Sequence, residues 1–269
     1  PLSSHLYAEV RLEKVNHLSV LAVFRDEYDT IAEWLAHHVQ QGVDFFVLIT
    51  NSRASERFRA AVQPWASKVT LIDVDDNESA QQSKTQLLNK YGLPLIKTSK
   101  WWVVLGSHDF MYARGSYNTL SDILRESDSH RNCRGSPASM IIVPWRQFGS
   151  NDLRIRPASV LTRYTMRRPL TETPSITSIF HGADVNEIGL HSPLMSPGSC
   201  TVNNNLEEVQ TPSERDRSPR FDWSSVALTD NAISLNHYEE PNSKGRAQDY
   251  SVVDKDIRQA HGFNATVNT

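Results

Sequence analysis

Two polar residues that can carry chemistry follow directly on one apolar run in the segment "WWVVLGSHDF", residues 101 to 110. The apolar residues "WWVVL" are typical of a strand buried on both faces, so we expect His108 and Asp109 in the turn that follows it. A histidine and a carboxylate at the end of a strand can accept a proton or bind a metal ion. Adjacent side chains on an extended segment point to opposite sides, however, which makes it difficult for both to reach one ion.

A second polar group follows the two earlier apolar runs, at 18 to 24 and at 43 to 49. The side chains concerned are Arg25, Asp26, Glu27 and Asn51. In an open α/β sheet the ligand crevice lies outside the carboxyl ends of the strands, so these side chains are predicted to converge there. An equally good interpretation is that Asp26 or Asp29 only caps the helix that follows.

The elements that must position these residues are short strands alternating with helices. Nearly continuous apolar runs predict strands at 18 to 24, 43 to 49, 68 to 74, 101 to 105 and 139 to 145. Apolar residues at three- and four-residue spacing from Ile31, followed by Gly42, predict a helix with its stop signal. Further helices are expected at 55 to 65, 78 to 91 and 117 to 127. This alternation indicates an α/β fold with a mainly parallel sheet and helices on both faces.

The chain is predicted to form one large domain with extensions. We expect an N-terminal extension at 1 to 17, the α/β domain at 18 to 194, a polar loop or insertion at 195 to 232 and a C-terminal segment at 233 to 269 that packs back on the domain. The stretch from 195 to 223 is rich in Pro, Ser, Asn and charged residues, with few side chains able to pack a core, so it is interpreted as a surface loop. A last helix is expected at about 247 to 259.

Composition and charge exclude several classes of partner. The chain has 269 residues and a formal net charge of −3, so no global basic field attracts nucleic acid or an anionic membrane. No run of about 18 apolar residues occurs, and we expect no transmembrane segment. Cys133 and Cys200 are expected as two free thiols rather than as a bridge. The compartment is left open, because the chain begins at Pro1 and a targeting segment can have been removed.

Several well-known catalytic motifs are missing from the sequence. It contains no GxxxxGK[ST], no GxGxxG after the first strand, no GxSxG and no HExxH, which argues against P-loop, dinucleotide-binding, α/β-hydrolase and zinc-protease chemistry. His37 and His38 are neighbours on the first predicted helix, where side chains one residue apart diverge by about 100°. We therefore interpret them as a helix flank and not as a metal-binding pair.

The ordered series of motifs resembles a family of glycosyltransferases. The segment "DEYDTIAEWLAHHVQQGVDFFVLITN" resembles the opening of the glycosyltransferase family 92 type and of related family 2-like transferases of the GT-A fold. The likeness continues with Gln81 or Gln82, with the tryptophans before the central strand, and with "HDF" where the family has "DxDEF". It extends through "VPWRQFGSNDLRIRPASVLTRY" at 143 to 164, His191 and "LNHY" at 235 to 238.

The resemblance implies an enzyme that transfers a sugar from a nucleotide-sugar donor to a glycan or other acceptor, with Mn²⁺ or Mg²⁺ at the acidic motif. When Phe110 is aligned with the family's Phe, Gly106 and His108 occupy the two Asp positions, so the customary carboxylate pair is missing. The residues assigned to nucleotide-sugar binding are Arg25, Asp26, Glu27, Asn51, Arg53 and Gln82. Those assigned to a metal ion are His108, Asp109, His191 and His237. Alternatively, His237 is a partly buried ring that is hydrogen-bonded to a backbone carbonyl.

The altered acidic motif leaves two further alternatives. In the first, the enzyme uses no metal, and cationic side chains hold the diphosphate of the donor. The candidate cations are Arg25, Arg53, Arg114, Arg146 and Lys244. In the second, the chain is a catalytically inactive relative that acts as a structural or assembly subunit with protein partners. If the chain is active, Asp109 is the preferred catalytic base, ahead of Asp152 and Glu187.

Overall fold

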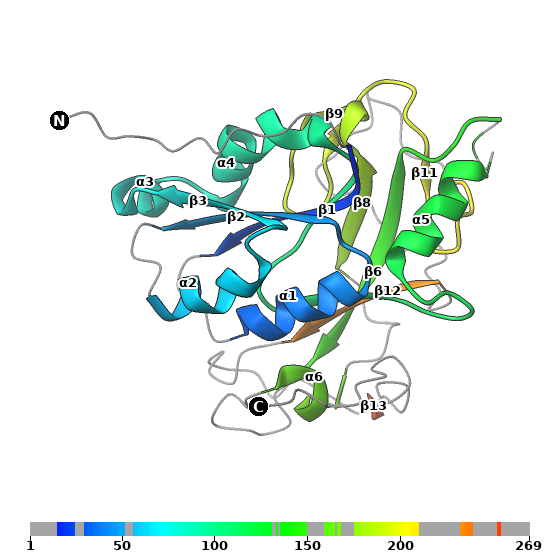
Figure 1. Cartoon of the computed structure of the whole chain (residues 1–269). Coiled ribbons are helices and arrows are strands. Elements are labelled where there is room, and N and C mark those ends of the chain that lie inside the picture. Colours follow the sequence, from blue (N-terminus) through cyan, green and yellow to red (C-terminus); the bar gives the residue numbers. More distant parts are fainter. Residues whose placement is uncertain are drawn as a thin grey trace.

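The computed structural model of the chain describes residues 15–24, 30–51, 56–130, 133, 135–149, 159–164, 166–167, 175–209, 232–238 and 252–253. Arg163, Val252 and Val253 are described in their backbone alone. These ranges form a central twisted sheet with helices packed against it (Figure 1).

The central sheet has the strand order β3-β2-β1-β4-β8-β6. The first four of these strands are parallel to one another, and β8 is antiparallel to both of its neighbours. Their bounds are β1 Asn16–Phe24, β2 Phe45–Asn51, β3 Val69–Val74, β4 Ser99–Val104, β6 Met140–Phe148 and β8 Ile176–His181. Every strand predicted from an apolar run is present, so the α/β class with a largely parallel sheet is confirmed.

Shorter strands extend the sheet next to β6. β12 (Ile233–Tyr238) pairs in parallel with β6 and in antiparallel with β5 (Asp109–Ala113). β11 (Thr201–Val202) also pairs with β6. The remaining short strands are β7 Met166–Arg167, β13 Val252–Val253, β9 Val185–Glu187 and β10 Leu194–Met195. The pairing with β12 matters for function, because it places His237 opposite Asp109.

Helices cover both faces of the sheet, as predicted. One face packs against α1 (Ile31–Gln40), α2 (Glu56–Val62) and α5 (Leu120–Ser129). The other face packs against α4 (Lys84–Leu87), the π-helical turn η2 (Leu88–Gly92) and the 3₁₀ segment η3 (Leu93–Thr98). The short elements α3 Asp76–Gln81, α6 Val160–Arg163, η1 Gln63–Trp65 and η4 Gly182–Asp184 complete the described set. None of the described helices is long and apolar enough to cross a membrane.

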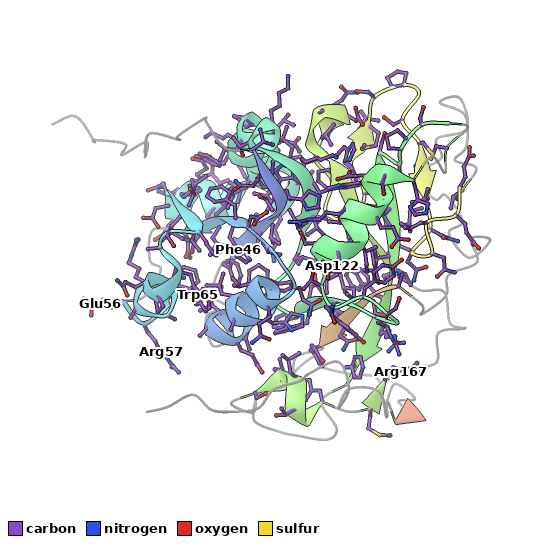
Figure 2. The ribbon with its side chains drawn as sticks, turned by 45° about the vertical axis from the view of Figure 1, so that its right-hand side comes forward. Phe46, Glu56, Arg57, Trp65, Asp122 and Arg167 are labelled. Carbon is purple, nitrogen blue, oxygen red and sulfur yellow. A yellow bond between two sulfur atoms is a disulfide. The ribbon has the colours of Figure 1, made fainter. Side chains whose placement is uncertain are left out.

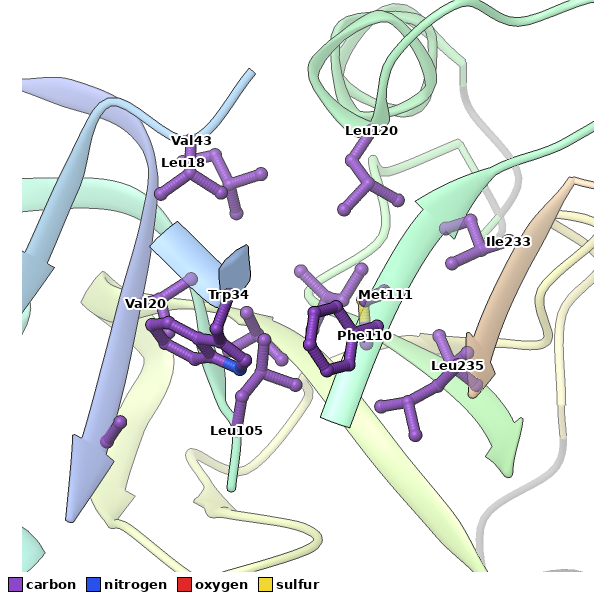
Figure 3. Close-up of a cluster of buried hydrophobic side chains, with 14 of the residues drawn as sticks. Leu18, Val20, Trp34, Val43, Leu105, Phe110, Met111, Leu120, Ile233 and Leu235 are labelled. Carbon is purple, nitrogen blue, oxygen red and sulfur yellow. The ribbon is translucent and has the colours of Figure 1, made fainter. Parts of the chain in front are cut away.

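The larger core lies between α1 and the sheet. Figure 3 shows the ring of Trp34 between Val20 of β1 and the pair Leu105 and Phe110. Trp34 and Phe110 are both completely buried. In Figure 2, side chains fill the space between the helices and the sheet, with Phe46 on the inside, while Glu56 and Arg57 project outward from α2. Burial of this apolar surface is the main favourable contribution to the fold.

Gly42 ends α1 in the way the sequence predicts. Its φ of +85° lies in the left-handed region, which favours glycine after a helix. The position is also crowded, because a Cβ on Gly42 would lie 2.7 Å from the Cβ of Ser121 in α5. A glycine is therefore needed here both for the turn and for the close approach of α5.

Two predictions about individual elements are wrong. The helix expected at 78 to 91 is divided at Gln82, because Ser83 caps a new helix through a reciprocal bond pair with Gln86. Asp109 is not part of the turn after β4 but the first residue of β5, which was not predicted at all. The strand β8 was also missed, because its buried sequence mixes Thr and Ser with apolar residues.

The segment from 195 onward is less exposed than expected. Within its described part, 195–209, Met195 and Val202 are buried and β11 joins the sheet, so this part is not a surface loop. Most of the helix expected at 247 to 259 lies outside the described residues, and its two described residues, Val252 and Val253, form a strand. The division of the chain into a domain with extensions remains a prediction.

A disulfide joins Cys133 to Cys200, so the expectation of two free thiols is wrong. The bridge links the segment after α5 to the residue just before β11, with Cα atoms 5.9 Å apart. Cys133 is buried and belongs to the main core. The bridge therefore helps to hold β11 against β6, the strand that also carries Trp145.

Replacing both cysteines, Cys133→Ser with Cys200→Ser, is expected to destabilise the protein. The bridge closes a loop with a sequence separation of 67, for which chain entropy gives a loss of up to about 4 kcal/mol. The measurement is urea unfolding of the wild type and of the double variant, with and without a reductant. A reductant should lower the stability of the wild type and leave the variant unchanged; equal stability of all four samples would contradict the bridge.

Candidate functional site

The strand order creates a crevice between β1 and β4. From β1 the chain proceeds outward to β2 and β3, and it then returns to β4 on the other side of β1. At such a switch point the loops after the two strands diverge, which leaves room for a ligand at their carboxyl ends. A pocket of about 190 Å³ lies there, lined by Val23 of β1 and Val104 of β4.

The pocket combines an apolar floor with a few titratable groups. The apolar part of its lining includes Leu88 and Leu190. The polar and aromatic lining residues are Lys84, Ser107, His108, Asp109, Trp145, His191 and His237. These side chains come from five parts of the chain that are distant in sequence: the start of α4, the segment from the β4–β5 turn to the start of β5, β6, the segment around 191, and β12.

Helix α1 fixes the turn after β4 and the start of β5, where Asp109 lies. The indole Nε1–H of Trp34 donates to the carbonyl oxygen of Asp109 at 2.9 Å and to that of Gly106 at 3.1 Å. One turn further along α1, His37 Nε2 donates to the carbonyl of Met111 at 2.8 Å. These bonds hold the backbone of the turn and of β5 against a rigid helix, so the position of Asp109 is set by α1.

The interpretation of His37 and His38 as a helix flank is therefore wrong. Both rings are buried, with exposed fractions of 2% and 0%. His38 donates from Nδ1 to the carbonyl of Trp34, and its Nε2 accepts the N–H of Met111. Burial, together with the neighbouring His37, lowers the pKa of His38 well below its usual value, so this ring is neutral. The two histidines are structural links between α1 and β5.

Asp109 is buried and bonded at both carboxylate oxygens. Oδ1 accepts from His237 Nδ1 at 2.7 Å, and Oδ2 accepts from the backbone N–H of Gly106 at 2.7 Å. Burial alone raises the pKa of Asp109, but the bond and charge of His237 and the bond from Gly106 outweigh it, so the pKa lies below its ordinary value. Such a carboxylate adds stability above its unfolded pKa of about 3.9, and this stability is lost as the pH falls through the folded pKa.

His237 is held in one orientation by its neighbours. Its ring stacks on Trp145 with centroids 4.5 Å apart and an interplanar angle of 20°. The ionised carboxylate of Asp109 can only accept a hydrogen bond, so in the neutral form of the His237 ring the proton lies on Nδ1 and the lone pair on Nε2. Nε2 has no hydrogen-bond partner among the described residues, and the side chain remains 25% exposed beside the pocket. Asp109, in contrast, is only 5% exposed, and each of its oxygens already accepts one hydrogen bond.

The four residues assigned to a metal ion do come together at this pocket. His108 lies against His237 with ring centroids 6.5 Å apart, and His191 lies edge-on to Trp145 at 5.2 Å. Nevertheless, the described residues contain no group of three or more His, Cys, Asp or Glu side chains arranged to hold a metal ion. The described donor set as it stands therefore does not fit an ion.

The residues assigned to nucleotide-sugar binding are placed only in part. Asn51 lies at the carboxyl end of β2 and Gln82 directly after α3, and neither lines the pocket. Arg25, Asp26, Glu27, Arg53, Asp152 and Lys244 lie outside the described residues. Of the other expected cations, Arg146 is 2% exposed and donates to the hydroxyl of Tyr112, away from the pocket.

Several pocket residues were not found from the sequence. Lys84 and Leu88 lie on the short helical segments after Ser83, where the sequence suggested one continuous helix. Trp145 was recognised only as part of a motif, although its stacking orients His237. The alternation of side chains along β6 was the available signal for Trp145, since neighbours on a strand face opposite sides.

Comparison with known proteins yields structural likeness alone. No protein-family model and no curated protein sequence matches the chain. Among solved structures, mannosyltransferase PcManGT from Pyrobaculum calidifontis, in complex with GDP-Man and Mn²⁺, is similar with 16% identity and a TM-score of 0.34, over 48% of this chain and 36% of that one. The 4-diphosphocytidyl-2C-methyl-D-erythritol synthase from Anaerococcus prevotii DSM 20548 gives 6% identity and a TM-score of 0.35, over 62% of this chain and 71% of that one.

A further 4-diphosphocytidyl-2C-methyl-D-erythritol synthase gives 11% identity and a TM-score of 0.36, over 68% of this chain and 94% of that one. Compared with the mannosyltransferase, this chain spans little more than a third of that protein's length. Likeness at this level does not indicate a shared activity.

Replacing Trp34 by Phe is expected to destabilise the protein by about 2 to 4 kcal/mol, because two buried carbonyl groups lose a donor and a void is left. The matched control is Trp65→Phe, since Trp65 is half-buried and its indole has no hydrogen bond among the described residues. The control should cost less than about 1 kcal/mol. The measurement is chemical denaturation of both variants; equal losses would show that the indole bonds of Trp34 do not hold the turn.

Proposed function

We propose that this chain is a nucleotide-sugar-dependent glycosyltransferase of the GT-A type, which transfers a sugar to a glycan or other hydroxyl-bearing acceptor. The observation that carries this proposal is the pocket at the switch point between β1 and β4, which is lined by residues 106–109, the segment that the resemblance aligns with the acidic motif. The order of the sequence motifs from 26 to 238 supports it, because several of them, around 106–110, 191 and 235–238, lie at this one pocket.

The chemistry of the lining fits an anionic donor. Lys84 supplies a permanent positive charge, and His108 and His191 can donate hydrogen bonds to phosphate oxygens. The apolar floor provided by Val23, Leu88 and Val104 suits a ring that is partly removed from water. A divalent ion, Mn²⁺ or Mg²⁺, would neutralise the departing diphosphate if residues beyond those described contributed ligands. The described residues alone would hold the diphosphate through Lys84 and the imidazoles.

One observation favours a second candidate function. The carboxylate of Asp109 is buried and accepts an internal hydrogen bond at each of its oxygens. A carboxylate bonded in this way is what we expect in a relative that kept the fold while its site residues took on structural roles. In that case the chain is an inactive relative that acts as a structural or assembly subunit, and its partners are proteins rather than nucleotide sugars.

Calorimetric titration with UDP and GDP separates these possibilities. The proposal predicts binding with a Kd in the micromolar to millimolar range, both in EDTA and after addition of Mn²⁺. Binding that requires Mn²⁺ would show that an ion site forms with residues beyond those described. Absence of binding at millimolar nucleotide under both conditions would contradict the transferase and favour the structural subunit.

The matched variants are Lys84→Gln in the pocket and Lys97→Gln on the exposed side of η3. Loss of one charged hydrogen bond to phosphate, worth about 1.5 to 3 kcal/mol, is expected to weaken nucleotide binding about 10- to 100-fold in Lys84→Gln. Lys97→Gln should bind as the wild type does. Equal affinity of both variants would place the nucleotide elsewhere.

A further inference from the structure

We infer that His237, and not Asp109, is the general base that takes the proton of the acceptor hydroxyl, and that Asp109 is the residue that positions it. This inference rests on the proposed transferase function and assigns the residue that removes the acceptor proton in that reaction. Three features carry it: the bond between Asp109 Oδ1 and His237 Nδ1, the stacking of His237 on Trp145, and the location of His237 at the pocket.

The hydrogen bonds decide which group can accept a proton. Asp109 is 5% exposed, and its two oxygens already accept from His237 Nδ1 and from the N–H of Gly106. A base must have a lone pair within reach of the hydroxyl it activates. In the neutral ring, Nε2 of His237 has that lone pair, and this nitrogen has no hydrogen-bond partner among the described residues. The pair thus works as a carboxylate that orients an imidazole, an arrangement known from other enzymes that activate hydroxyl groups.

The other titratable groups at the pocket are less suitable. His191 has no carboxylate bonded to it among the described residues, and only the edge contact with Trp145 orients its ring. Glu187, an alternative base in the sequence analysis, is exposed on β9 and does not line the pocket. Asp152, the other alternative, lies outside the described residues. The orientation of His237 is fixed from two sides, by the hydrogen bond to Asp109 and by the stacked ring of Trp145.

The reaction balances with no further reactant. The oxygen of the acceptor hydroxyl forms a bond to the anomeric carbon of the donor sugar, and the bond from that carbon to the diphosphate oxygen breaks. The electron pair of the broken bond leaves with the nucleoside diphosphate, and the hydroxyl proton moves to Nε2 of His237. The carboxylate of Asp109 stabilises the imidazolium through the bond to Nδ1, and the proton is later released to water.

The test is the release of nucleoside diphosphate from UDP-glucose, UDP-galactose, UDP-N-acetylglucosamine and GDP-mannose by the full chain, with water or methyl glycosides as acceptors. Donor affinity is measured separately by calorimetry. The variants are His237→Gln, His237→Ala and Asp109→Asn, and the control is His130→Gln, because His130 is exposed at the end of α5. Added imidazole tests whether a free base replaces the missing ring in His237→Ala.

We expect kcat to fall about 10²- to 10⁴-fold in His237→Gln, which is the usual range for loss of a general base, with donor affinity changed less than about threefold. Imidazole should restore part of the activity of His237→Ala. Asp109→Asn should lower kcat without changing the KM for the donor and should not respond to imidazole. A role of either residue in folding alone would change donor affinity and kcat together and would give no rescue.

Other results overturn the inference in distinguishable ways. If donors bind and His237→Gln keeps kcat within about threefold of the wild type, His237 is not the base, whereas the proposed function survives. If the wild type binds donors and releases no diphosphate, the inference and the proposed sugar transfer both fail, whereas donor binding stands. If no donor binds, the proposed function itself fails. If the variants misfold and lose donor affinity, the wild type is treated with diethyl pyrocarbonate instead. The inference then predicts that enzyme activity falls in parallel with modification of His237. Loss of activity that does not follow this modification would contradict it.

Discussion

The site depends on the hydrogen bonds that helix α1 makes to the backbone of residues 106–111. Trp34 bonds two carbonyl groups of the turn, and His37 and His38 bond Met111. All three side chains are buried, so these bonds are shielded from water and costly to break. They fix where β5 begins, and β5 in turn fixes the register of β12 through the pairing of Asp109 with His237. Helix α1 thereby sets the position of β12, a strand about 200 residues later in the sequence.

This constraint explains how the pocket acquires an oriented histidine. The carboxylate of Asp109 accepts hydrogen bonds from Gly106 and His237. The bond from Nδ1 of His237 leaves the second nitrogen of the ring at a pocket with an apolar floor. In the proposed mechanism the carboxylate therefore acts through its neighbour. Trp145, stacked on the imidazole from β6, completes the arrangement.

The sequence predicted the fold better than the site. Apolar runs located β1, β2, β3, β4 and β6, because strands buried on both faces need continuous apolar sequence. The roles of His37, His38 and Trp34 escaped prediction, because single-residue patterns do not show which backbone groups a buried side chain will meet. The disulfide escaped for a similar reason, since Cys133 and Cys200 are brought together only by the packing of β11 on β6. The pairing of Asp109 with His237 depends on strand register, which a sequence without homologues does not reveal.

The most direct test is the tautomer of the neutral His237 ring, measured from its ¹⁵N chemical shifts in the wild type over a pH series. We predict that the neutral ring carries its proton on Nδ1 and none on Nε2, and that these shifts change in Asp109→Asn. A proton on Nε2 of the neutral ring, or shifts that are the same in wild type and Asp109→Asn, would contradict the claim that Asp109 directs the basic nitrogen of His237 toward the pocket.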